Sequence, residues 1–330
     1  MNYLITGGAG FIGSHLADRL IARNDWVVAL DDLSTGSVDN VGHLKDERRF
    51  RLEHGSILDP DIVRRLTVET DVVVHLAAAV GVKLIVERPL ESFITNIRGT
   101  QVVLEAAADS GRKILVTSTS EIYGKNANGP LREDADRILG SPLKSRWSYS
   151  AAKAADEMFA HAYWRERGTP TIIVRLFNTV GPRQTGEFGM VVPRFVRQAI
   201  RDEDLTVYGD GTQRRCFCHI ADVVDAIVGV LDHPEAVGGV FNVGSQSEIT
   251  IDDLADAVIR MTGSSSGVVH IPYDQAYEQG FEDMQRRTPD TTRLRELTGW
   301  APTRSFEEIL SDVIAFERAH RTSHDQRSSA

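Results

Sequence analysis

A tyrosine and a lysine four residues apart carry the clearest chemistry in the sequence. Tyr149 and Lys153 lie within a helical pattern over 148–167, so both side chains should leave one face of a helix, one turn apart. A phenol titrates near 10, so a tyrosinate base at neutral pH needs roughly 3 pH units of stabilisation, which a neighbouring ammonium can supply. Two surface side chains would give the same spacing, so the interpretation depends on the surrounding motifs.

Three glycines near the N-terminus could hold a phosphate group. Gly7, Gly10 and Gly13 follow a short apolar run at 3–6 and open a helical pattern at 12–22. The first glycine permits a tight turn, the second lets a pyrophosphate approach the backbone, and the third lets the helix pack closely on the sheet. The helix N-terminus then presents its N–H groups to the anion. Taken alone, the glycines fit a plain glycine-rich loop equally well.

An acidic pair follows the second predicted strand, at 26–31. Asp31 lies 18 residues after Gly13, where a carboxylate can accept hydrogen bonds from the adenosine ribose and repels a 2′-phosphate. The position therefore favours NAD over NADP, and Asp32 is its neighbour. The alternative is a solvated strand end.

A polar run comes at the end of another predicted strand, at 113–118. Thr117, Ser118, Thr119, Ser120 and Glu121 follow one another there, and ligands bind at the carboxyl ends of parallel strands. A hydroxyl there can hydrogen-bond a sugar oxygen, and a carboxylate can move a proton to a neighbouring carbon. Without the tyrosine and lysine, a Ser/Thr-rich loop would be the simpler interpretation.

The elements that must position these residues alternate in type. Short apolar runs rich in β-branched residues are typical of buried parallel strands, and amphipathic stretches between them are typical of helices. The strands are expected at 3–6, 26–31, 72–76, 113–118 and 171–175, and the helices at 12–22, 90–109 and 148–167. This order predicts an α/β fold, a Rossmann-type doubly wound parallel sheet.

The remainder of the chain predicts a smaller C-terminal lobe that binds the substrate. Residues 1–178 are expected to form the nucleotide-binding domain, with a returning segment at about 219–245 that holds a helix and a strand. Residues 179–218 and 246–320 would form the substrate-binding lobe. The polar end, 321–330, is expected to be a frayed tail.

Composition excludes several classes of function. The 330 residues carry 37 Lys and Arg against 47 Asp and Glu, a net charge of −10, and have no basic run suited to nucleic acid. No apolar run reaches the roughly 20 residues of a membrane span. The two cysteines, Cys216 and Cys218, form no zinc-type set, so no metal site is expected, and they fit a reducing cytoplasm.

Together, the motifs resemble those of one enzyme family. The chain is similar to extended short-chain dehydrogenases/reductases of the NAD-dependent epimerase/dehydratase family, which act on nucleotide sugars. The resemblance runs from Met1 to about Arg318 and rests on TGGAGFIGSH, LDDLSTG, HLAA, NIRGT, TSTSEIYG, YSAAK, RLFNTVGP and DTTRLRELTGW.

The resemblance implies a set of site residues. Those implied at the NAD site are Gly7, Gly10, Phe11, Ile12, Gly13, Asp31, Asp32, Ser34, Thr35, Gly36, Ser56, Ile57, Leu76, Ala77, Ala78, Asn96, Thr117, Tyr149 and Lys153. Those implied at the nucleotide-sugar site are Thr119, Ser120, Glu121, Tyr149, Asn178, Val191, Arg194, Arg215 and Arg287, with Arg286 also a candidate. The catalytic residues would be Thr119, Glu121, Tyr149 and Lys153. For the arginines, surface ion pairs are the alternative.

The resemblance also implies a homodimer in which each subunit contributes the helices at 90–109 and 148–167. Otherwise, both helices would serve only to cover the sheet.

The family's reactions are implied to share a first step. Tyr149 would take the proton of the C4 hydroxyl while hydride passes to NAD, giving a 4-keto sugar. Decarboxylation, dehydration or epimerisation could follow. Glu121 argues against a plain 4-epimerase, dTDP-glucose dehydratases usually have Asp-Glu where this chain has Ser120-Glu121, and GDP-mannose dehydratases usually use NADP.

UDP-glucuronate decarboxylases resemble the chain at a further set of residues. They share Thr119-Ser120-Glu121, several share the lead-in Arg146-Trp147, and several have an Arg-x-Pro like that at Arg287. We therefore predict UDP-glucuronate decarboxylation. The alternatives are 4-epimerisation of UDP-glucose or UDP-glucuronate, 4,6-dehydration, and a nucleotide-binding sensor without catalysis.

Overall fold

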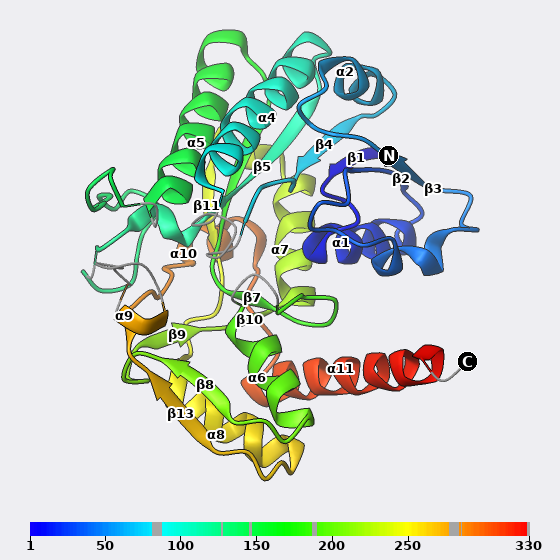
Figure 1. Ribbon diagram of the computed structural model, residues 1–330. Helices are drawn as coiled ribbons and strands as arrows, with labels where there is room; N and C mark the ends of the chain where they lie inside the picture. Colours follow the sequence, from blue (N-terminus) through cyan, green and yellow to red (C-terminus); the bar gives the residue numbers. More distant parts are fainter. Residues whose placement is uncertain are drawn as a thin grey trace.

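The computed structural model describes residues 1–80, 88–126, 128–144, 147–186, 190–276, 284 and 286–328 (Figure 1). In these ranges, no helix combines the length and the apolar character needed to cross a membrane. Arg146, part of one predicted motif, lies outside them.

A seven-stranded sheet forms the centre of the larger domain, with the strand order β11-β6-β5-β4-β1-β2-β3. All six pairings are parallel, and the inner strands are buried on both faces. The strands are β1 (Asn2–Thr6), β2 (Trp26–Asp31), β3 (Phe50–His54), β4 (Val72–His75), β5 (Lys113–Thr119), β6 (Thr171–Leu176) and β11 (Val240–Val243). This is the doubly wound α/β fold that the sequence predicts.

Helices cover both faces of this sheet (Figure 1). The helices on one face are α1 (Phe11–Ala22), α7 (Ile220–Asp232) and α10 (Thr292–Thr298), which share one apolar core with the sheet. Those on the other face are α2 (Pro60–Val68), α4 (Pro89–Asp109) and α5 (Ser148–Arg167), which share a second core. The sheet is thus held between two layers that exclude water from its strands.

The second lobe has its own apolar core. Its helices are α6 (Val191–Ile200), α8 (Ile251–Thr262) and α11 (Phe306–Ser328), and its short strand pairs are β8 (Leu205–Tyr208) with β13 (Val268–Ile271) and β9 (Arg214–Cys216) with β12 (Glu248–Thr250). A further pair, β7 (Thr179–Val180) with β10 (Cys218–His219), lies where the chain leaves the sheet and returns. The short helices are η1 (Val38–Asn40), η2 (Gly42–Leu44), η3 (Ser120–Tyr123), η5 (Pro234–Ala236) and α9 (Tyr273–Ala276).

The structure differs from two of the expectations for the C-terminal part. Although 246–320 was expected to belong to the second lobe, α10 packs on the large domain, where Leu294 joins the core beside α7 and Trp300 donates from Nε1 to Asp222 O at 2.8 Å. Residues 321–328, expected to be part of a frayed tail, belong to α11, which continues to Ser328. Its apolar side chains up to Ile314 enter the core of the second lobe and anchor the helix.

A buried polar network joins the strands on one side of the sheet. Arg175 on β6 donates to both carboxylate oxygens of Glu157 on α5, at 2.9 and 2.8 Å, and to the Tyr123 hydroxyl at 2.8 Å. Tyr123 in turn donates to Asn242 Oδ1 on β11 at 2.7 Å. Burial raises the pKa of Tyr123 to about 12, so the phenol stays protonated and able to donate.

Replacing Arg175 should therefore destabilise the large domain. Arg175→Met leaves Glu157 as a largely buried carboxylate without its partner, a change that typically costs about 3–5 kcal/mol. The measurement is the free energy of unfolding in urea. Arg165→Met, which removes an exposed arginine from α5, the helix that carries Glu157, is the matched control. Equal effects of the two substitutions would contradict the account.

Candidate active site

The glycine loop between β1 and α1 is shaped by close backbone contacts. Gly7 has φ +71°, and a Cβ there would lie 2.8 Å from Ala77 N. A Cβ on Gly13 would overlap Gly7 O, so the glycine lets α1 lie directly on the loop. Gly10 precedes the helix and offers no side chain to cap it, which leaves the first N–H groups, those of Phe11 and Ile12, to an outside acceptor.

The Asp31 carboxylate lies against this loop. One oxygen accepts from Ala9 N at 2.9 Å and the other from Leu33 N at 2.8 Å. Burial raises the pKa of Asp31 above its usual value, and hydrogen bonds from the backbone N–H groups of Leu33, Ala9 and Gly10 oppose part of this rise. A Cβ on Gly36 would lie 2.8 Å from this carboxylate, so the glycine keeps the space beside it open. The combination fits the predicted dinucleotide site, with Asp31 at its ribose end.

The neighbouring acidic residue faces solvent instead. Asp32 Oδ1 accepts from Ser34 N at 3.0 Å and from Ser34 Oγ at 2.6 Å, and Thr35 is exposed beside them. These three predicted cofactor residues form a turn at the surface.

The next strands bring the other predicted cofactor residues to the same edge of the sheet. Ser56 and Ile57 follow β3, and Leu76, Ala77 and Ala78 follow β4. Asn96, predicted to lie along the cofactor, is 1% exposed, and its amide both accepts from Ala79 N at 2.8 Å and donates to Ala79 O at 3.1 Å. Asn96 therefore holds the backbone of Ala79, in the loop after β4, in place.

Sequence reasoning missed His75 as a site-supporting residue. Its ring bridges Thr6 on β1, at 2.7 Å, and Thr100 on α4, at 3.0 Å. Burial and the charge of Lys153 lower the pKa of His75 to about 3, so the ring is neutral. Thr117 donates to His75 O at 2.8 Å. The HLAA motif was the available signal.

The tyrosine and lysine lie on α5, as predicted, and both are buried. Tyr149 is 8% exposed and Lys153 is 2% exposed. Burial raises the pKa of Tyr149, and the negative charges of Glu121 and Asp156 raise it further. The phenol is therefore protonated in this state.

The polar run begins within β5, and its last two residues, Ser120 and Glu121, open η3. Thr119 Oγ1 accepts from Glu121 N at 3.2 Å as the N-cap of this short helix, and Ser150 on α5 donates to Glu121 O at 2.8 Å. These bonds tie the run to the helix that carries Tyr149. Ser120 is buried at the start of η3.

Three predicted substrate residues from distant parts of the chain meet here. Arg287 donates from one guanidinium nitrogen to Asn178 Oδ1 at 2.6 Å and places another 3.7 Å from Glu121 Oε1. Asn178, which follows β6, donates to Cys216 O at 2.9 Å. Arg287 is 7% exposed, so a largely buried guanidinium lies beside the Glu121 carboxylate.

The other predicted arginines have different surroundings. Arg194 donates to Thr206 O at 3.0 Å and its guanidinium lies 4.3 Å from the Tyr208 ring centre, which are contacts within the second lobe. Arg286 pairs with Glu248 on an exposed face. The structure does not bring these two to Glu121. Arg215 lies on β9 and is 9% exposed, and the predicted substrate residue Val191 opens α6.

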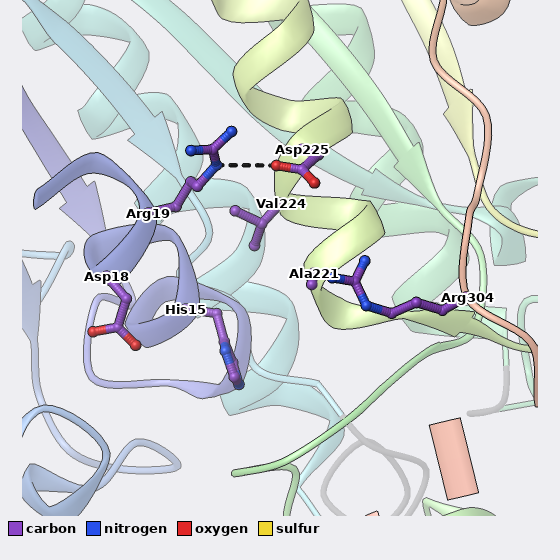
Figure 2. Close-up of a pocket in the computed structure, with 7 residues that line it drawn as sticks. All are labelled: His15, Asp18, Arg19, Ala221, Val224, Asp225 and Arg304. Atoms are coloured by element: carbon purple, nitrogen blue, oxygen red, sulfur yellow. Dashed lines mark hydrogen bonds and ion pairs between the residues drawn. The ribbon is translucent and has the colours of Figure 1, made fainter. Parts of the chain in front are cut away.

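A separate hollow of about 370 Å³ lies between α1 and α7 (Figure 2). Its charged side chains already pair: Arg19 donates to Asp225 at 3.0 Å across the hollow, and Arg304 donates to Asp222 at 2.7 Å. None of the residues that line it is among the predicted site residues, so we place the chemistry at the sheet edge instead.

Known proteins resemble this chain over nearly its whole length. The model of the GDP-mannose 4,6-dehydratase family matches residues 4–313. The UDP-N-acetyl-alpha-D-glucosaminuronate decarboxylase of Bacillus cytotoxicus is 40% identical over 96% of this chain and 97% of its own length. UDP-glucuronic acid decarboxylase 1 of Arabidopsis thaliana is 34% identical over 99% of this chain and 72% of its own length.

A solved structure gives the same result for the fold. The UDP-glucuronic acid 4-epimerase of Bacillus cereus, in complex with UDP-glucuronic acid and NAD, superimposes with a TM-score of 0.88 at 29% identity, over 97% of this chain and 100% of that one. The resemblance inferred from the sequence motifs is therefore confirmed, and the chain belongs to the GDP-mannose 4,6-dehydratase family of extended short-chain dehydrogenases/reductases.

Proposed function

We propose that the protein is an NAD-dependent decarboxylase of a UDP-hexuronate, with UDP-glucuronate as the substrate. One observation carries the proposal: Arg287 lies 3.7 Å from Glu121, whose charge acts on Tyr149, in a chain whose relatives include decarboxylases of UDP-uronates. A buried guanidinium at this place offers a donor pair for the C6 carboxylate that such a sugar carries.

The glycine loop and Asp31 would hold NAD, which would supply a reversible hydride acceptor for C4 of the sugar. The side chains of this chain handle the protons. Tyr149 accepts the proton of the C4 hydroxyl and gives it back at the end, with the Lys153 ammonium favouring its ionised form. Thr119, at the end of β5, would hydrogen-bond the C4 oxygen.

The ketone at C4 places the C6 carboxylate β to a carbonyl group, and such a carboxylate readily loses carbon dioxide. The C5–C6 bond breaks, carbon dioxide leaves, and the electron pair of that bond becomes the C4–C5 double bond of an enolate whose negative charge lies on the C4 oxygen. Tyr149 and Thr119 would stabilise this oxygen. A proton from solvent water, delivered to C5 with the assistance of Glu121, restores the ketone. Arg287 would hold the carboxylate until the bond breaks.

A second candidate substrate carries a 2-acetamido group. The relative from Bacillus cytotoxicus, named for a UDP-N-acetylglucosaminuronate, is 40% identical, against 34% for the Arabidopsis thaliana enzyme named for UDP-glucuronate. The two reactions would use the same residues at C4, C5 and C6, because the substrates differ only at C2.

We also propose that the protein forms a homodimer through α4 and α5, which pack side by side (Figure 1). Apolar side chains project from the outer face of this pair: Leu90 is 73% exposed, Ile94 42% and Met158 65%. Such a cluster favours burial against a second copy.

The two cysteines are buried and unbridged, which supports a reducing compartment, the cytoplasm.

Incubation of the protein with each UDP-uronate and NAD tests the proposed reaction. We expect carbon dioxide and UDP-xylose from UDP-glucuronate, detected by NMR. Tyr149→Phe, which lacks the base, should lower kcat by about 10²–10⁴-fold. Conversion of the 2-acetamido substrate alone would support the second candidate, and UDP-galacturonate as the sole product would replace decarboxylation with epimerisation.

Removing the guanidinium should weaken binding of the substrate carboxylate. Arg287→Met is expected to raise the Kd of UDP-glucuronate by about 10–100-fold, the loss expected for hydrogen bonds between charged groups. The Kd of UDP-glucose, which has no carboxylate, should change far less, and calorimetry measures both. An equal loss for the two ligands would show that Arg287 serves the fold rather than the carboxylate.

Charging the outer face of the two helices should separate the subunits. Met158→Glu is expected to shift the mass measured by light scattering from a dimer to a monomer, because the interface would bury an unpaired carboxylate. Val68→Glu, on the 57% exposed Val68 of α2, is the control. A wild-type protein that is already monomeric would refute the dimer.

A further inference from the structure

A buried carboxylate that the proposed mechanism does not use lies one helical turn beyond Lys153. Asp156 Oδ2 accepts from Lys153 Nζ at 2.7 Å, and the side chains are 0% and 2% exposed. Both residues lie on α5, so the helix itself fixes their separation. The ammonium that is placed to stabilise the Tyr149 phenolate is therefore held by a second anion.

Stability alone does not explain this ion pair. Burying two charges has a large desolvation cost, and apolar replacements of such pairs are often neutral or stabilising. In the part of the chain that the structure describes, the other carboxylate oxygen, Asp156 Oδ1, has no hydrogen-bond partner. A buried oxygen without a partner is itself unfavourable, so the arrangement points to a role in the chemistry of the neighbouring groups.

Four charged or titratable groups lie near Tyr149 or near the Lys153 ammonium. Glu121 approaches from η3, Lys153 and Asp156 from α5, and His75 lies near the ammonium from β4. His75 is neutral, and the charge of Glu121 is partly balanced by Arg287 at 3.7 Å. Within this group, Asp156 is thus the carboxylate that pairs directly with Lys153.

We propose that Asp156 is a positioning residue for Lys153, holding its ammonium in place and setting the pH at which the phenol of Tyr149 ionises. The proposal rests on the proposed function in taking Tyr149 as the base. Counted over Tyr149, Lys153 and Asp156, the cluster is neutral with the phenol protonated and carries one negative charge once the proton leaves. Without the carboxylate, loss of the proton takes the cluster from +1 to neutral, which is easier in a buried site.

Asp156→Asn keeps the shape and an acceptor oxygen for Lys153 but removes the charge. The acid limb of the kcat/KM profile should shift to lower pH by about one unit or more, the size expected for a close charge in a buried site. Glu166→Gln, which removes an exposed carboxylate near the end of the same helix, should leave the profile in place. Asp156→Glu, which restores the charge, should move the limb back toward the wild-type position.

A direct titration separates this proposal from the choice of sugar substrate. The tyrosinate absorbance of the NAD-loaded protein, taken as a difference from Tyr149→Phe, reports the ionisation of Tyr149 without any substrate. The midpoint of this titration should move to lower pH in Asp156→Asn, and in Asp156→Ser if the first variant folds poorly. An unchanged titration, or a lowered Tm with no shift in either profile, would overturn the role of Asp156. Failure of the wild-type protein to convert either UDP-uronate would overturn only the proposed function.

Discussion

The site depends on one buried positive charge, the Lys153 ammonium. It is 2% exposed, lies one turn along α5 from Tyr149, and must remain charged in a place that favours neutral groups. The structure supplies the counter-charge from Asp156 and keeps the nearby His75 neutral. Burial and the charges of Glu121 and Asp156 raise the pKa of Tyr149. The proposed role of Tyr149 as a base therefore requires nearby positive charge, which the ammonium and a bound cofactor would supply.

The parallel sheet brings the parts of this site together. β1, β2, β4, β5 and β6 run in the same direction, so the glycine loop, Asp31, Thr119 and Asn178 all lie at one edge, although they are far apart in sequence. Arg287 comes from the segment between β13 and α10 and reaches the same edge through Asn178. The proposed cofactor cradle thus belongs to the sheet, while the proposed substrate contacts would join the sheet to later segments of the chain.

Much of this arrangement could be predicted from the sequence, where local pattern determines structure. β2, α5 and β11 lie where the apolar patterns place them, because continuous buried runs and helical faces are local signals. β3 was missed because its sequence, FRLEH, is that of a half-exposed edge strand with charged residues. The Lys153–Asp156 ion pair was not predicted, because a spacing of three residues does not show that both side chains are buried. The contacts of Arg194 with Tyr208 were not foreseeable, because they depend on the packing of the second lobe.

The central claim is that one bound sugar is oxidised, decarboxylated and reduced again at this single site. UDP-glucuronate carrying deuterium at C4 tests it most directly, with the product analysed by mass spectrometry and NMR. The account predicts UDP-xylose that still carries the deuterium at C4, since the hydride is taken and returned by the same bound cofactor. Pentose that has lost the label to solvent, or no pentose at all, would contradict it.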